Sequence, residues 1–97
     1  MSWFRKNTNR ELSPQLLLLS GDESAIAKVE EELLGNGNCL KVSLGVILVG
    51  PSSLRTSDWL SLIGEREKDL KILVVGLTGT WATRDLPKCA EWLRAHL

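Results

Sequence analysis

Apolar residues in this chain gather in runs of strand length, separated by stretches with helical periodicity. Residues 15–20 (QLLLLS) form a continuous apolar run bounded by Pro14 and Gly21. Such a run is typical of a strand covered on both faces, as in parallel sheets. Residues 71–78 are rich in β-branched side chains and are closed by Gly79, and they form the clearest strand pattern in the chain.

Residues 39–49 are predicted to form one long strand. Apolar and polar residues alternate in the first half, and the second half is apolar at nearly every position, so the strand should pass from half-exposed to buried. The segment between Val42 and Val46 is too short for the crossover that two parallel neighbours require. We therefore expect a single strand, bulged at Gly45, because a glycine inside a strand often marks a bulge.

Three amphipathic helices are predicted, starting near residues 25, 56 and 85. Candidate N-terminal caps stand just before or at the start of the first two: Asp22 or Ser24, then Thr56 or Ser57. The resulting order, β-α-β-α-β-α, predicts a small α/β domain of two or three layers, with a mostly parallel three-stranded sheet and right-handed crossovers.

The chain of 97 residues is long enough for one domain with a modest core. We predict a single α/β domain over residues 15–97. Residues 1–14 carry Trp3 and Phe4 ahead of a polar stretch, and they are expected to form a flexible arm or a short N-terminal edge strand.

Charge and cysteine content narrow the class of protein. Twelve basic residues balance twelve acidic ones, so neither nucleic acid nor a membrane surface is expected as a partner. Two distant cysteines and one histidine argue against a zinc site, and we expect no metal and no cofactor. No stretch reaches the length of a membrane span, and a reduced cytoplasmic protein is the simplest account.

The expected parallel sheet would bring three loops together, because ligands of open α/β sheets bind beyond the carboxyl ends of the strands. These loops supply the predicted partner-binding residues: Asp22, Glu23, Ser52, Ser53, Thr78, Thr80 and Trp81. The Gly, Ser and Thr content would also suit a phosphate or nucleotide held by backbone N–H groups. Turns and helix caps need the same residue types, however, and the chain has no GxGxxG or GxxxxGK[ST] motif.

No complete catalytic set is visible in the sequence. Ser52, Ser53 or Ser57 would need a base within hydrogen-bond reach, and the single histidine, His96, stands next to the last residue. Asp22 and Glu23 could hold Mg²⁺ with waters, but helix capping explains these two carboxylates more simply. We therefore expect no catalytic residues and no enzyme. Four tryptophans are many for this length, and Trp81 is expected either to contact a partner or to fill the core.

The segment LLLLSGDESAIAKVEEELLGNGNCLKVSL resembles the opening of a response-regulator receiver domain, with an acid pair, Asp22 and Glu23, after the first strand. The segments GVILVGPSS and DWLSLIGEREKDLKILVVGLTGT look like the third strand, third helix and fourth strand, with Thr78 or Thr80 at the place of the switch hydroxyl. Gly50 stands where a receiver has its phosphoacceptor aspartate, and the fifth strand with its lysine is missing. The resemblance thus implies a pseudo-receiver that docks partners without chemistry.

The chain is also similar in length and element order to STAS domains, as found in anti-anti-sigma factors. Their regulatory serine would fall near Ser57, where Thr56-Ser57 replaces the usual Asp-Ser pair. Both resemblances imply a regulatory module, and we expect a non-enzymatic signalling domain that binds another protein or a second copy of itself. The alternative is a small phosphate- or nucleotide-binding domain that uses the same loops.

Overall fold

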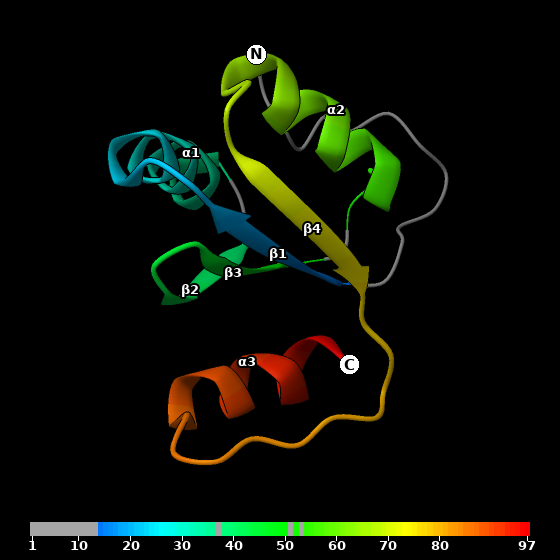
Figure 1. Ribbon diagram of the computed structural model, residues 1–97. Helices are drawn as coiled ribbons and strands as arrows, with labels where there is room; N and C mark the ends of the chain where they lie inside the picture. The colour runs from blue at the N-terminus through cyan, green and yellow to red at the C-terminus, as the bar shows by residue number, and fades with distance from the viewer. Residues whose placement is uncertain (1–13, 37, 51, 53) are drawn as a thin grey trace.

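The computed structural model describes residues 14–36, 38–50, 52 and 54–97 of the chain. The expected arm or edge strand, apart from Pro14, lies outside these residues, as do Pro51 and Ser53. The described part forms a small α/β domain with the following elements: β1 (Gln15–Ser20), α1 (Glu23–Asn36), β2 (Cys39–Ser43), β3 (Val46–Val49), α2 (Thr56–Arg66), β4 (Lys71–Gly76) and α3 (Pro87–His96) (Figure 1).

The sheet corrects the predicted fold, because it has four antiparallel strands in the order β2-β3-β1-β4. β1 runs antiparallel to both of its neighbours, so that Gln15 lies opposite Val49 on one side and Gly76 on the other. The expectation of a mostly parallel, three-stranded sheet is therefore wrong. Up to β4, the strand and helix order is that of the split β-α-β, or ferredoxin-like, topology. α3 is an addition to it.

The predicted long strand over residues 39–49 is in fact a hairpin. The chain reverses at Leu44 and Gly45, and β2 then pairs antiparallel with β3. Gly45 has φ 74°, and a Cβ atom at this position would lie 2.3 Å from the carbonyl oxygen of Leu19. Its N–H donates a 2.8 Å hydrogen bond to the buried carboxylate of Glu30 on α1. The reversal thus depends on the absence of a side chain at Gly45.

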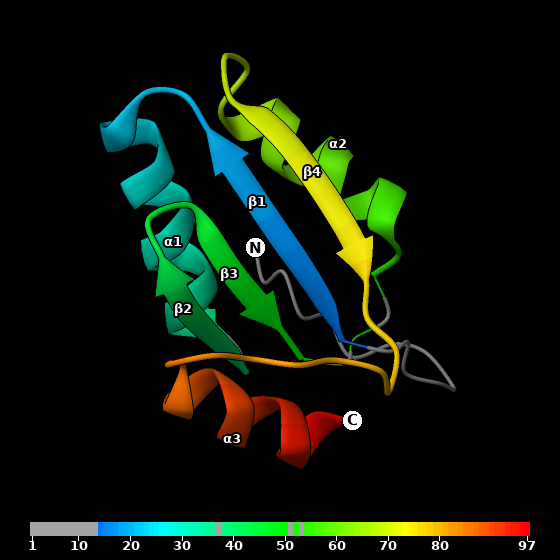
Figure 2. The ribbon, with the colours of Figure 1, turned by 60° about the horizontal axis from the view of Figure 1, so that its bottom comes forward.

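The sheet is covered by helices on both of its faces, but not equally (Figure 2). α1 packs on β1 and β2, and α2 packs on β4, both from the same side. α3 lies on the opposite side and contacts β2. The continuous apolar run of β3 therefore reflects two covered faces, and such a run is compatible with an antiparallel strand as well as with a parallel one.

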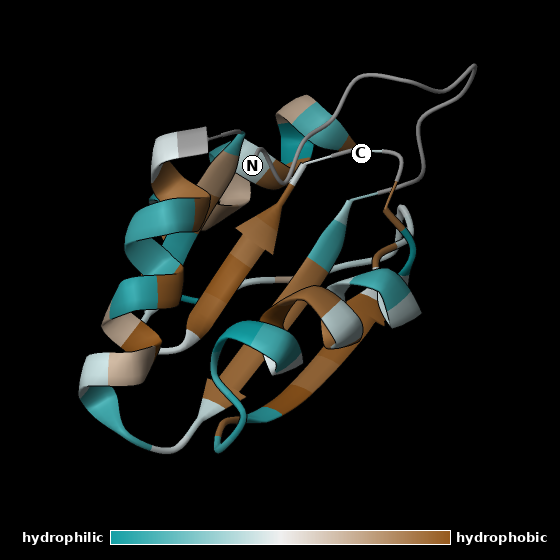
Figure 3. Ribbon diagram, turned by 90° about the horizontal axis from the view of Figure 1, so that it is seen from above, coloured by the Kyte–Doolittle hydropathy of each residue, from teal (hydrophilic) through white to brown (hydrophobic). Residues whose placement is uncertain are grey.

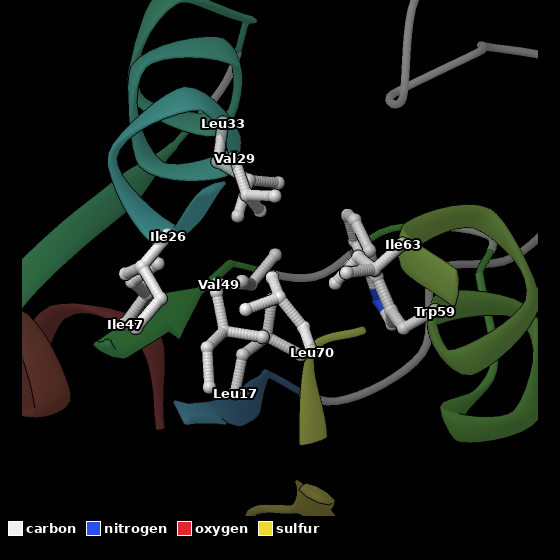
Figure 4. Close-up of a cluster of buried hydrophobic side chains, with 10 residues drawn as sticks. Leu17, Ile26, Val29, Leu33, Ile47, Val49, Trp59, Ile63 and Leu70 are labelled. Atoms are coloured by element: carbon white, nitrogen blue, oxygen red, sulfur yellow. The ribbon is translucent and has the colours of Figure 1, made fainter. Parts of the chain in front are cut away.

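The main core lies between the sheet and the first two helices. Side chains of α1 and α2 point toward those of the strands in Figure 4, and brown follows the strands in Figure 3 while teal and brown alternate along the helices. Fully buried Trp59 and Ile63 of α2 pack with Leu17 of β1. The cluster comprises Leu17, Leu19, Ile26, Val29, Leu33, Ile47, Val49, Trp59, Ile63 and Leu70.

A second, smaller cluster joins α3 to the other face of the sheet. Leu48 of β3 packs here with Cys89 and Leu93 of α3. The end of α3 is held by His96, whose side chain hydrogen-bonds to Asn38 beside β2 and also donates from Nδ1 to the Trp92 carbonyl at 2.7 Å. No helix among the described residues is long and apolar enough to cross a membrane.

Candidate functional site: the β4 half of the sheet

Within the described part of the chain, α3 covers its face of the sheet over β2 and β3, and the β4 side chains on this face are exposed. One row of side chains on this face runs from Leu48 through Leu16 to Val75, following the strand register. Leu48 is 3% exposed, whereas Val75 is 39% exposed. In the next row, Leu18 of β1 leads to Leu73 of β4, which is 54% exposed. The apolar face thus continues beyond α3 into solvent.

β4 is also an edge strand of the described sheet. The N–H of Leu77 donates to the carbonyl of Pro14 at 2.9 Å, and the paired register runs without a shift through all of β4. Because the two sides of a strand alternate, this register turns the N–H and C=O groups of Ile72, Val74 and Gly76 away from β1. These groups have no strand partner among the described residues.

Few of the usual protections appear on this edge. Natural edge strands are guarded by proline, by bulges, by charged side chains or by a covering element. β4 has neither a proline nor a bulge, and its one charged residue, Lys71, stands at its start. A shallow depression of about 200 Å³ lies on the β1–β4 surface and is lined by Leu18, Leu19, Ser20, Lys71, Ile72 and Leu73. We call the uncovered face and the open edge of β4 the β4 surface.

Another depression, of about 260 Å³, lies between β2 and the start of α3. Its lining includes Lys41, Asp85 and Lys88. The Lys41 ammonium group already forms an ion pair at 3.1 Å with Glu30, which joins β2 to α1. In the described part of the chain, the outward N–H and C=O groups of β4 have no strand partner, so the β4 surface is the stronger candidate site.

The predicted loop site is divided by the antiparallel sheet. The ends of β3 and β4 both lie beside Gln15, at the start of β1. Ser52 and Thr78 follow these two ends, whereas Asp22 and Glu23 follow Ser20 at the opposite end of β1. Two of the three loops therefore share one end of the sheet, and the acid pair does not join them.

The acid pair begins α1. Asp22 accepts hydrogen bonds from the Ser24 hydroxyl and, at 3.1 Å, from the Ala25 N–H. Both bonds lower the pKa of the Asp22 carboxyl from its ordinary value, and the bond from the Ser24 hydroxyl has the larger effect. Glu23 is exposed in the first turn of the helix. Among the described residues, no three His, Cys, Asp or Glu side chains are grouped to hold a metal ion.

The hydroxyl groups of Ser52 and Thr78 accept hydrogen bonds within their own loops. Ser52 Oγ accepts the Leu54 N–H at 3.2 Å, and Thr78 Oγ1 accepts the Thr80 N–H at 3.4 Å. Such bonds are typical of turns built by Ser and Thr. Ser57 is exposed in the first turn of α2. In the same turn, the Asp58 carboxylate accepts a hydrogen bond from the N–H of Arg55, the residue before the helix. Ser53 lies outside the described residues.

Trp81 is half-buried and packs against the second cluster beneath α3.

Of the two cysteines, Cys39 packs against the main core, and burial raises the pKa of its thiol to about 12. A thiol with so high a pKa is almost entirely protonated at neutral pH and is a poor nucleophile. Cys39 therefore serves packing.

No protein-family model matches the chain, and comparisons with curated proteins and with solved structures find no match. The resemblance to receiver and STAS domains therefore stays a prediction. The fold alone does not assign a function to this chain, because one fold hosts many functions.

Proposed function

We propose that this domain is a non-enzymatic, cytoplasmic regulatory module that binds a polypeptide through the β4 surface. The observation that carries the proposal is the edge at Ile72, Val74 and Gly76, which pairs with no other strand of the described residues and lies beside exposed Leu73 and Val75. An extended segment can add to such an edge as a further strand, with backbone hydrogen bonds for affinity and side-chain contacts for specificity.

The side chains of the β4 surface favour a polypeptide over a nucleic acid. Sheets that bind single strands stack bases on aromatic rings and line the backbone path with positive charge. Leu16, Leu18, Leu73 and Val75 supply aliphatic groups here, and Lys71 is the one charged residue of β4. Aliphatic side chains at these positions suit the alternating contacts of an added β-strand.

A phosphate or nucleotide ligand stays the alternative. Its support is weaker because the acid pair lies at the other end of the sheet and the hydroxyls of Ser52 and Thr78 each accept a bond within their own loop. We therefore place the interaction on the β4 surface.

Affinity capture from an extract of the source cell tests the proposal. Leu73→Lys adds a charge to the β4 surface, and Leu34→Lys makes the same change at a similarly exposed leucine on α1. We expect Leu73→Lys to reduce recovery of a bound protein at least about tenfold, because a lysine at an edge opposes strand addition. Leu34→Lys should leave recovery unchanged. Equal recovery with both variants would rule out the β4 surface as the binding site.

A further inference from the structure

We propose that the polypeptide bound at the β4 surface is a second copy of this chain. In this dimer, β4 of each copy pairs antiparallel with β4 of the other about a two-fold axis that passes between the two Val74 residues. The inference rests on the proposed function and specifies its partner. The result is one continuous antiparallel sheet, with α1 and α2 of both copies on the same face.

The backbone of β4 is complementary to itself in this register. Ile72, Val74 and Gly76 direct their N–H and C=O groups outward. With Val74 opposite Val74 of the second copy, Ile72 comes opposite Gly76, and each opposed pair can exchange two hydrogen bonds. Every outward group of the strand is then paired. A register shifted by two residues would leave either Ile72 or Gly76 without a partner.

The exposed side chains match in the same register. Leu73 comes opposite Val75 of the second copy, and Val75 opposite its Leu73. Both residues lie on the face that α3 leaves uncovered, at 54% and 39% exposure. Directly opposed aliphatic side chains shield each other across an antiparallel pair. The apolar row through Leu48, Leu16 and Val75 then continues through Leu73 and Leu18 of the second copy.

The charges also permit a second copy. Lys71 comes opposite Leu77 of the second copy, so the two Lys71 side chains stand at opposite ends of the paired strands. The chain has twelve basic and twelve acidic residues, and two copies carry no net charge that would repel. A six-residue strand buries a small area, and we therefore expect weak association, with a dissociation constant on the order of 10 µM.

A charge-pairing experiment on the full chain tests the register. The variant Leu73→Lys/Val75→Lys places lysine opposite lysine in the dimer, and Leu73→Glu/Val75→Glu places glutamate opposite glutamate. Mixed together, the two variants place lysine opposite glutamate at both positions. Sedimentation velocity should show the wild-type mass rising from one chain to two between about 1 µM and about 1 mM. Each variant alone should stay at one chain, and the mixture should form a one-to-one dimer.

Two further variants control for folding and for charge. Leu34→Lys on α1 should dimerise like the wild type. Gly76→Pro removes an outward N–H at an exposed position where a Cβ atom meets nothing within 4 Å. It should weaken the dimer at least about tenfold without adding charge. A wild type that keeps the mass of one chain throughout, or a mixture that fails to assemble, would overturn the proposal.

Hydrogen exchange separates this inference from other occupants of the edge. The amides of Ile72, Val74 and Gly76 should exchange more slowly as the protein concentration rises. Protection that is independent of concentration would mean that the same chain covers the edge, and the proposal would be wrong. If the chain stays single while Leu73→Lys still abolishes capture of another protein, the second copy is excluded but the proposed function stands. If capture and mass are both insensitive to Leu73→Lys, both proposals fail.

Discussion

The two edges of the sheet are treated differently by the rest of the chain. At the β2 edge, a register shift between Lys41 and Ser43 interrupts the pairing, Lys41 is paired with Glu30, and α3 lies against the strand. At the β4 edge the register is unbroken, and the face that α3 covers elsewhere is open. Bulges, charges and covering helices are the means by which proteins block unwanted strand pairing.

The difference between the two edges lies in what covers them. Both edges belong to one antiparallel sheet and both strands are largely apolar, so composition does not separate them. What separates them is the placement of α3 over β2 and β3. α3 is an addition to the β-α-β-β-α-β arrangement. Among the described residues, it covers one half of this face and leaves Leu73 and Val75 of the other half exposed.

The largest expected effect is the difference in stability between a substitution under α3 and the same kind of substitution on the exposed face of β4. Leu48→Ala removes a side chain that is 3% exposed beneath α3, and we expect it to lower the free energy of unfolding by about 3 kcal/mol. Leu73→Ala should change it by no more than about 0.5 kcal/mol, because this side chain already faces solvent. Urea denaturation at low protein concentration measures both. Equal losses would mean that the two halves are covered alike.

A smaller effect is expected at two glycines, one in each half. Gly45→Ala puts a Cβ atom 2.3 Å from the Leu19 carbonyl at a residue with φ 74°, and should cost about 2 kcal/mol of stability. Gly76→Ala meets nothing within 4 Å and should stay within about 0.5 kcal/mol of the wild type. Thermal unfolding of the two variants provides the check. A stable Gly45→Ala protein would contradict the hairpin between β2 and β3.

The smallest effect concerns Asp22, which caps the helix that packs on β1 and β2. Its pKa is lowered in the folded state, so its bonds stabilise the fold above the ordinary aspartate pKa, and this contribution disappears as the pH falls through the folded-state value. Asp22→Asn should therefore be slightly less stable than the wild type at pH 7, with the gap closing below about pH 4. Glu23→Gln is the neighbouring control. A gap that stays constant with pH would exclude the capping carboxylate as its origin.

Local patterns in the sequence predict several elements well. Pro14 and Gly21 bound the apolar run that forms β1, and the helical spacing of Ile26, Val29 and Leu33 places all three in the core. These elements are set by neighbouring residues, through chain breakers and through the side chains that share a helix face. Their position in the sequence therefore follows from short-range rules.

Strand direction could not be predicted in the same way. The turn at Leu44 and Gly45 has two residues, so the alternation of Val42, Leu44, Val46 and Leu48 continues through the reversal. Periodicity therefore looks the same for a hairpin as for one long strand. Gly45 is the local signal, and a glycine within a strand pattern is compatible with a bulge as well as with a turn.

The candidate site could not be predicted from the sequence, because it depends on which strand the helices leave exposed. β4 is apolar at alternate and intervening positions alike, which predicts burial on both faces. Among the described residues, α3 lies over β2 and β3, and Leu73 and Val75 are left exposed.

The central position of β1 also has a consequence for how the chain reaches its fold. β1 comes before its partners in sequence, and its two ladders join residues as distant as Gln15 and Gly76. Folding must close long loops before these pairs form, which is slow compared with local helix formation. During synthesis, the leucine-rich β1 therefore emerges well before β3 and β4 can shield it. In that interval its exposed leucines make it prone to association with other chains.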